Sequence, residues 1–193
     1  MRKIKELYQH SLHELTVTKN VVLCGLMVAL AIVLSTIASI SFGPYIRIGF
    51  SGIPNRIVEF LFGPVVGSLF GGALDILKYI LKPNGPYFYG FTLSAMLSGI
   101  IYGTILYRKP LSIVRVILAE FLIKVFINCI LNTFWLSMLY GDGFFVLLPL
   151  RVLKNLVMFP VDSIILFLSL AYIKKIVPQF GFTVAKAPVH KII

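Results

Sequence analysis

The sequence predicts an all-α integral membrane protein, a six-transmembrane-helix bundle that forms a single membrane domain over residues 1–193. Two observations predict this class. Hydrophobic residues make up 59% of the chain and the mean hydropathy is +0.95, which is more apolar surface than a soluble domain of this length can bury. The apolar residues also fall in runs of about 20, the length that a helix needs to cross the hydrocarbon core of a bilayer.

Five of the six runs are long enough to be clear spans, and the first is too long for a signal-peptide core, so we expect it to be retained. The second run is short and contains Pro54, Asn55, Arg56 and Glu59, which is typical of a re-entrant segment or of a short span with a buried polar face. Arg56 and Glu59 can pair on one face of a helix. The predicted spans are 21–40, 46–62, 65–81, 91–107, 116–140 and 147–173.

The charge distribution predicts that both termini are cytoplasmic. The net charge is +11, and Lys and Arg accumulate on the cytoplasmic side of membrane proteins. With six spans, 11 of the 18 basic residues lie in the cytoplasmic segment 1–19, around the loop at 108–115 and in the C-terminal region from Lys174 onward, which includes the cytoplasmic tail 177–193. The outer loops, 41–50, 82–90 and 141–145, are rich in Gly and aromatic residues, which fits either a lid over a flat ligand or an interfacial aromatic belt.

Small residues repeat every four positions in three spans, which places them on one helix face where another backbone can approach closely. We expect Gly63, Gly67 and Gly71, which lead into the third span and continue along it, and Ala95, Gly99 and Gly103 in the fourth span, to pack within the bundle. Gly25 and Ala29 in the first span fit either internal packing or a helix of another protein.

Ionisable residues at membrane depth are costly and mark functional positions. The fifth span carries Glu120, Lys124, Asn128, Asn132 and Trp135 on one face, and the sixth carries Arg151, Asn155 and Asp162. Lys124 and Asp162 lie at matching depth, which predicts a structural ion pair in the inner half of the membrane.

Positive charge is concentrated in the predicted outer half. The basic residues there outnumber the acidic ones, Asp75 and Asp142, which favours a ligand that is anionic at one end and aromatic along its body. Snorkelling of long side chains to the interface is the alternative. The basic residues are Arg47, Lys78, Lys82, Arg151 and Lys154.

Patterns typical of catalysis are missing from the sequence, which has neither a Ser/His/Asp set nor a Gly-rich phosphate loop. Two isolated cysteines and three histidines in the tails form no metal pattern, so we expect neither a metal nor a cofactor. An intramembrane enzyme is therefore disfavoured, and transport driven by ATP needs a partner that supplies the ATPase.

Four segments together resemble a known family: ALAIVLS, RIGFSGIP, FGPVVGSLFGGALDILKY and YFYGFTLSAMLSGIIYG. They are similar to the substrate-binding S components of energy-coupling factor (ECF) vitamin transporters, most closely the folate-type members, over about half of the chain. The resemblance implies a six-helix bundle in the bacterial cell membrane that captures a vitamin outside, between the outer halves of the last three spans and the outer loops. It also implies docking, through small residues of the first span, on a transmembrane coupling protein that carries two ATPases, with Gly25 and Ala29 in the docking positions.

A folate-type ligand would place its rings against aromatic side chains, its glutamate carboxylates on cations and its pterin edge on acceptors. Thr92 and Ser94 would add hydroxyl groups. Open alternatives are an S component for another vitamin such as pantothenate, and a self-sufficient small transporter. The predicted substrate-binding residues are Arg47, Phe50, Asp75, Lys78, Phe88, Phe91, Thr92, Ser94, Asn128, Asn132, Trp135 and Arg151.

Overall fold

The protein is a helical bundle with one small β-hairpin. The computed structural model describes residues 2–37, 39–42, 46–83 and 85–180. Within these residues, four helices are long and apolar enough to cross a membrane: α2, α3, α4 and the helical stretch Phe144–Gln179. The elements are α1 (Arg2–Glu14), α2 (Thr18–Ile37), β1 (Ser39–Phe42), β2 (Ile46–Gly49), α3 (Ile53–Leu81), α4 (Tyr89–Leu106), α5 (Ile113–Leu122), η1 (Ile123–Leu131), α6 (Asn132–Tyr140), α7 (Phe144–Ile176) and η2 (Val177–Phe180).

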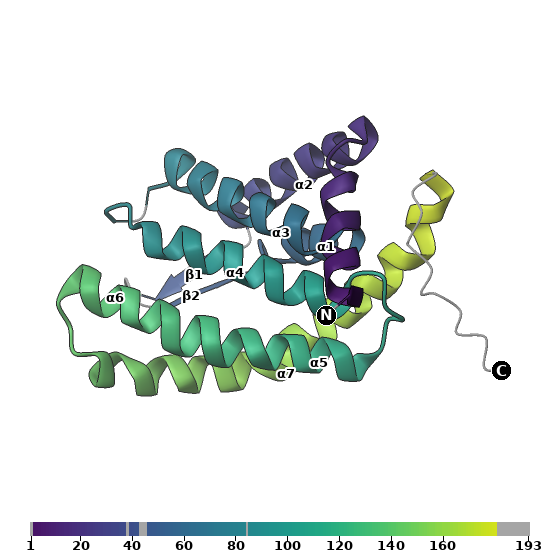
Figure 1. The fold of residues 1–193 in the computed structure, drawn as a ribbon. Helices are drawn as coiled ribbons and strands as arrows, with labels where there is room; N and C mark the ends of the chain where they lie inside the picture. The colour runs from purple at the N-terminus through teal and green to yellow at the C-terminus, as the bar shows by residue number, and fades with distance from the viewer. Residues whose placement is uncertain (1, 38, 43–45, 84, 181–193) are drawn as a thin grey trace.

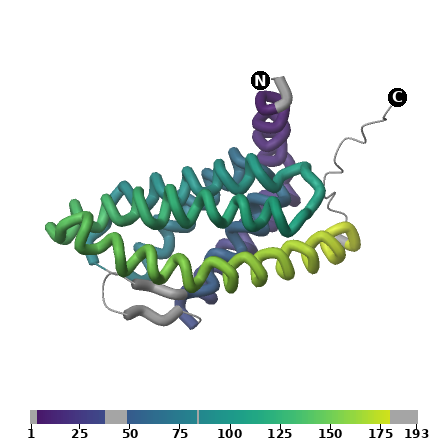
Figure 2. The backbone as a smooth tube through the Cα atoms, turned by 90° about the horizontal axis from the view of Figure 1, so that it is seen from below, coloured from purple at the N-terminus to yellow at the C-terminus, as the bar shows by residue number. Residues whose placement is uncertain are grey.

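The helices run lengthwise and the connections gather at two ends of the bundle (Figure 1). The α3–α4 and α6–α7 connections lie at one end, which we call the loop end. The helix α1, the α4–α5 connection and the end of α7 lie at the other. Figure 2, turned by 90°, shows the same separation, with α1 standing across the direction of the other helices.

The helix α3 consists of two segments joined at Gly63, whose φ of 88° and ψ of −168° lie outside the helical region. Pro64 follows and starts the second segment, so this junction is the tight turn between the second and third predicted helices. The start of the second predicted span, at residue 46, is wrong. Residues 46–49 form β2, which pairs antiparallel with β1, and the helix begins only at Ile53.

The helix α1 closes the turn at Gly63 from outside the bundle. The turn leaves the first backbone N–H groups of the second α3 segment without helical partners. The buried Ser11 hydroxyl accepts hydrogen bonds from the N–H groups of Val65 (3.0 Å) and Val66 (3.3 Å) and donates to the carbonyl of Phe62 (2.7 Å). Sequence analysis treated 1–19 as a polar segment and did not find this helix.

The helices α3 and α4 touch backbone to backbone. A Cβ added at Gly99 would lie 2.5 Å from the carbonyl carbon of Gly67, and one at Gly103 would lie 2.4 Å from the nitrogen of Pro64. Contacts this short exclude any side chain. The predicted internal packing of the two small-residue stripes is therefore confirmed.

The fifth predicted span is a continuous helix built from α5, η1 and α6, and its central nine residues are π-helical. Such segments are rare and are often found at functional sites. This one carries Lys124 and Asn128, and Asn132 follows directly.

We predict that Gly103→Ala lowers the midpoint of thermal unfolding in detergent, because the added methyl would push α4 away from Pro64. Overpacking of this kind costs about 1–3 kcal/mol. The control is Gly25→Ala, since nothing lies within 4 Å of a Cβ at Gly25. Equal midpoints for the two variants would contradict the close packing of α3 and α4.

Candidate ligand-binding site

A cavity of about 400 Å³, which we call the main cavity, lies between α3, α4, the long helix α5–η1–α6 and α7. Its wall includes Lys82, Pro86 and Tyr87 of the α3–α4 connection and Tyr140 at the end of α6, so it reaches the loop end. Volumes of this size are typical of pockets for small organic ligands.

Cationic side chains dominate the charge of the main cavity. Lys78, Lys82, Arg151 and Lys154 line it, against Asp75 as the carboxylate among the described residues of its wall. The Lys78 ammonium donates to Ser51 (3.1 Å) and the Arg151 guanidinium to the carbonyl of Asn128 (3.3 Å). A wall with this charge favours an anionic ligand group.

Aromatic rings form the side of the cavity next to the α3–α4 connection. Phe88 and Phe91 stand edge to face, with ring centroids 6.0 Å apart, and the ring of Tyr87 lies 5.0 Å from that of Tyr79. All four line the main cavity. They offer faces and edges on which a planar ligand can stack.

A hydrogen-bonded chain ties this aromatic segment to α3. The Thr92 hydroxyl donates to Asp75 (2.7 Å), so the Tyr87 hydroxyl is the donor in its own 2.7 Å contact with Thr92. Thr92 therefore stands behind Asp75 and orients its carboxylate, while Asp75 itself lies in the wall.

Trp135 stands behind Phe88 instead of lining the main cavity. Its Nε1 donates to the Ser94 hydroxyl (3.1 Å), and its ring lies 5.7 Å from that of Phe88. A Cβ at Gly90, in the first turn of α4, would come within 2.5 Å of the indole, so a side chain at this position would collide with Trp135. The indole therefore supports the rings that line the cavity.

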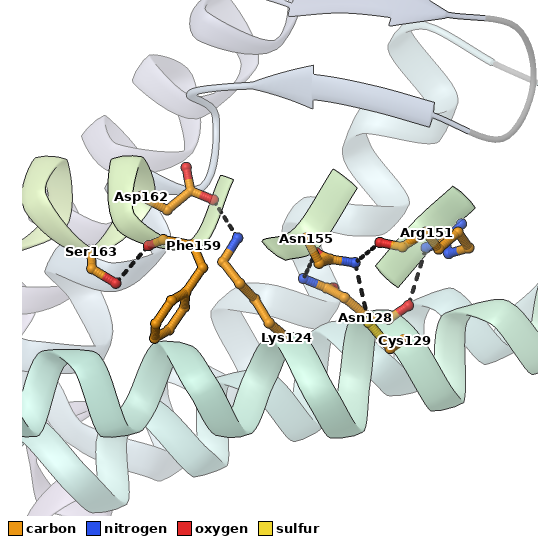
Figure 3. Close-up of polar contacts among 8 residues, drawn as sticks. All are labelled: Lys124, Asn128, Cys129, Arg151, Asn155, Phe159, Asp162 and Ser163. Atoms are coloured by element: carbon orange, nitrogen blue, oxygen red, sulfur yellow. Dashed lines mark hydrogen bonds and ion pairs between the residues drawn. The ribbon is translucent and has the colours of Figure 1, made fainter. Parts of the chain in front are cut away.

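Amide side chains cross the floor of the main cavity. Asn132 donates to Asn128 (3.3 Å), Asn128 donates to Asn155 (3.4 Å), and Asn155 donates to the carbonyl of Arg151 (2.9 Å). Figure 3 shows Asn155 of α7 reaching toward Asn128 and Cys129 of η1. This network joins the long helix to α7.

The predicted ion pair forms deeper in the bundle. The Lys124 ammonium lies 2.5 Å from Asp162, and Figure 3 shows it crossing from the long helix to α7. The Arg56–Glu59 pair also forms, at 2.9 Å, with Glu59 fully buried. The guanidinium of Arg56 lies 3.8 Å above the ring of Tyr102.

Two smaller cavities continue from the main one. The first, about 210 Å³, shares Asp75, Phe91, Asn128 and Asn132 with it and also includes Ser94. The second, which we call the deep cavity, has about 160 Å³ and shares Asn128 with both. The three therefore follow one another along the long helix, and Phe50 lies in the wall of the deep cavity.

The structure brings most of the predicted site residues together. Asp75, Lys78, Phe88, Phe91, Asn128, Asn132 and Arg151 line the main cavity, Ser94 and Phe50 line the two smaller ones, and Thr92 and Trp135 stand behind the walls. The side chain of Arg47 lies outside the described residues, as does the end of the predicted tail, 181–193. The prediction missed Tyr79, Tyr87 and Tyr140, although Tyr87 stands in the aromatic loop that it had singled out.

Gly25 and Ala29 lie on a surface of α2 that no other part of the described chain covers. Both are exposed, and the space around Gly25 is open. Leu26 and Leu30 are exposed beside them. The small-residue face of α2 around Gly25 and Ala29 is therefore not used for packing within the described bundle.

Comparisons with known proteins agree on one family. The sequence model of the family described as "ECF transporter, substrate-specific component" matches residues 19–170. A folate transporter FolT of Clostridium novyi (strain NT) is 40% identical over 141 residues, which cover 73% of this chain and 81% of the relative. A folate transporter FolT of Leuconostoc mesenteroides subsp. mesenteroides is 30% identical over 151 residues, covering 75% of this chain and 80% of the relative.

A solved structure has a similar fold. The crystal structure of FolT bound with folic acid superposes with a TM-score of 0.73 at 35% sequence identity, and the match covers 78% of this chain and 92% of that one.

Proposed function

The chain belongs to the substrate-specific components of ECF transporters, and from this premise we propose that it binds folate at the outer face of a bacterial cell membrane and delivers it inward with an ATP-driven partner module. Members of this family are transport components, not enzymes. The observation that carries the choice of folate is the cation-rich, aromatic-walled main cavity in a chain that is 40% identical to a folate transporter.

The proposed topology has six spans with both termini in the cytoplasm. The two segments of α3 count as two short spans, and the continuous helix α5–η1–α6 counts as one. The basic segments near 108–115 and at the end of α7 lie at the same end of the bundle as α1 (Figure 1), which supports one cytoplasmic face. The loop end then faces the exterior.

Each part of folate has a proposed partner in the cavity. The glutamate carboxylates meet Lys78 and Arg151, and Arg47 is a further candidate. The pterin and benzoyl rings pack against Phe88 and Phe91, which Trp135 supports. The remaining contacts, with the polar edges and the inner end of the ligand, are proposed for Phe50, Asp75, Thr92, Ser94, Asn128 and Asn132.

The proposed partner is an ECF module, a transmembrane coupling protein with two ATPase subunits. The open surface of α2 around Gly25 and Ala29 is the proposed docking site, because exposed small residues let a second helix approach closely.

One prediction of the proposed function concerns the ligand. Purified protein should retain folate, and Arg151→Ala should weaken binding about 10- to 100-fold, the range expected on losing a hydrogen bond to a charged group. Isothermal titration in detergent measures both affinities. The control is Lys175→Ala, an exposed residue at the end of α7. Tight binding of pantothenate, thiamine or riboflavin without folate binding would defeat the choice of substrate.

Another prediction separates docking on the partner module from binding of folate. Gly25→Leu should leave folate affinity unchanged and abolish most ATP-dependent uptake, because the larger side chain would keep a partner helix from approaching α2 closely. Uptake of labelled folate into vesicles that contain the coupling protein and its ATPases measures the effect. Val157→Leu, which adds bulk at an exposed position of α7, is the control. Unchanged uptake by Gly25→Leu would show that the module docks elsewhere.

A further inference from the structure

Four cationic side chains line the main cavity, and the contacts proposed for folate use two of them. Lys78 and Arg151 are assigned to the glutamate carboxylates, whereas Lys82 and Lys154 are assigned to no part of the ligand. Against the carboxylate of Asp75, four cations leave an excess of three positive charges in the described wall. Folate with one glutamate carries two carboxylates, so a ligand with a third carboxylate would balance this wall better.

Lys78 and Lys82 lie one helical turn apart at the end of α3. The backbone N–H of Lys82 donates to the carbonyl of Lys78 (2.9 Å), so the helical hydrogen bonding continues up to this residue. Both side chains line the main cavity, which places them on the same face of α3. Because four residues advance about 6 Å along a helix, the second cation follows the first toward the loop end at that interval.

The two lysines differ in their surroundings. The ammonium of Lys78 donates to Ser51 (3.1 Å), and the side chain is half-buried, whereas Lys82 is exposed. Lys82 belongs to the part of the wall at the loop end, together with Pro86 and Tyr87 of the α3–α4 connection. Lys78 is therefore the inner cation of the pair, and Lys82 stands at the mouth of the cavity.

A γ-linked glutamate chain carries carboxylates at a matching interval. Each link adds one α-carboxylate, and five bonds separate successive α-carbons, which lie at most about 6 Å apart. The main cavity has a volume of about 400 Å³, near the lower end of the range for small organic ligands. A glutamate added to the tail of folate therefore continues outward through the mouth, where its carboxylates come beside Lys82.

We propose that Lys82 extends the anion-binding part of the site to folates with γ-linked oligoglutamate tails, and that it pairs with a carboxylate of the second glutamate while Lys78 holds the first. This inference rests on the folate binding proposed above. It goes beyond that proposal by naming a wider class of substrate and the residue that recognises it.

The exposure of Lys82 sets the size of the expected effect. Ion pairs between exposed groups contribute little, which corresponds to a gain in affinity of about 2- to 5-fold for the second glutamate at low salt. Salt screens exposed charges, so this gain should disappear as the salt concentration rises from about 20 mM to about 500 mM. The salt dependence of the wild-type protein is thus a reading that needs no variant.

The test compares folic acid with pteroyl-γ-diglutamate, which has the same rings and one more glutamate. Dissociation constants are measured in an uncharged detergent, and the ratio of the two constants is the result, because a partly unfolded sample does not distort it. At low salt, the wild type and Lys82→Arg should bind the diglutamate about 2- to 5-fold more tightly than folic acid, and Lys82→Gln should bind the two equally. The control, Lys175→Gln, removes an exposed cation at the far end of α7 and should keep the preference.

Three results would overturn the inference while leaving folate binding intact. They are equal affinity of the wild type for the two ligands at low salt, a preference for the diglutamate that Lys82→Gln retains, and a preference that high salt does not reduce. Failure of the wild type to bind folic acid would overturn both proposals.

Discussion

The excess of positive charge in the main cavity is the constraint around which this structure is organised. Lys78, Lys82, Arg151 and Lys154 face Asp75 within the described wall. Cations at membrane depth are expensive unless they are paired or meet water or a ligand. Deeper in the bundle, Lys124 and Arg56 pair with carboxylates, so the excess of cationic over anionic side chains lies toward the end where the aromatic loop lies.

The packing of the helices makes such a cavity possible. Because α3 and α4 meet through Gly67, Gly99 and Gly103 without intervening side chains, they form a solid wall. The π-helical segment of the long helix then presents Lys124 and Asn128 toward α7, and the amide network holds the two helices together. A rigid wall opposite a polar one leaves room for a ligand between them.

The sequence predicted the features that depend on periodicity and missed those that depend on tertiary contacts. Hydropathy located the long helices, four of which are long and apolar enough to cross a membrane within the described residues. Four-residue spacing found the α3–α4 contact, and helix depth found the Lys124–Asp162 pair. The start of the second span was wrong because the apolar residues at 46–49 pair with β1, and a short apolar run does not separate a strand from a helix. For the site, charge and aromatic content indicated Arg151 and Phe88, but sequence cannot show that Trp135 stands behind Phe88 while Tyr87 faces the cavity.

The most direct test of the central claim is the affinity of the wild-type protein for folic acid relative to pteroic acid, which has the same rings but no glutamate. If the cations of the main cavity hold the anionic tail, pteroic acid should bind at least about tenfold more weakly, as expected when charge-assisted hydrogen bonds are lost. Pteroic acid keeps one carboxylate on its benzoyl ring, so equal affinity for the two compounds would show that the glutamate carboxylates gain nothing from the cations of the main cavity.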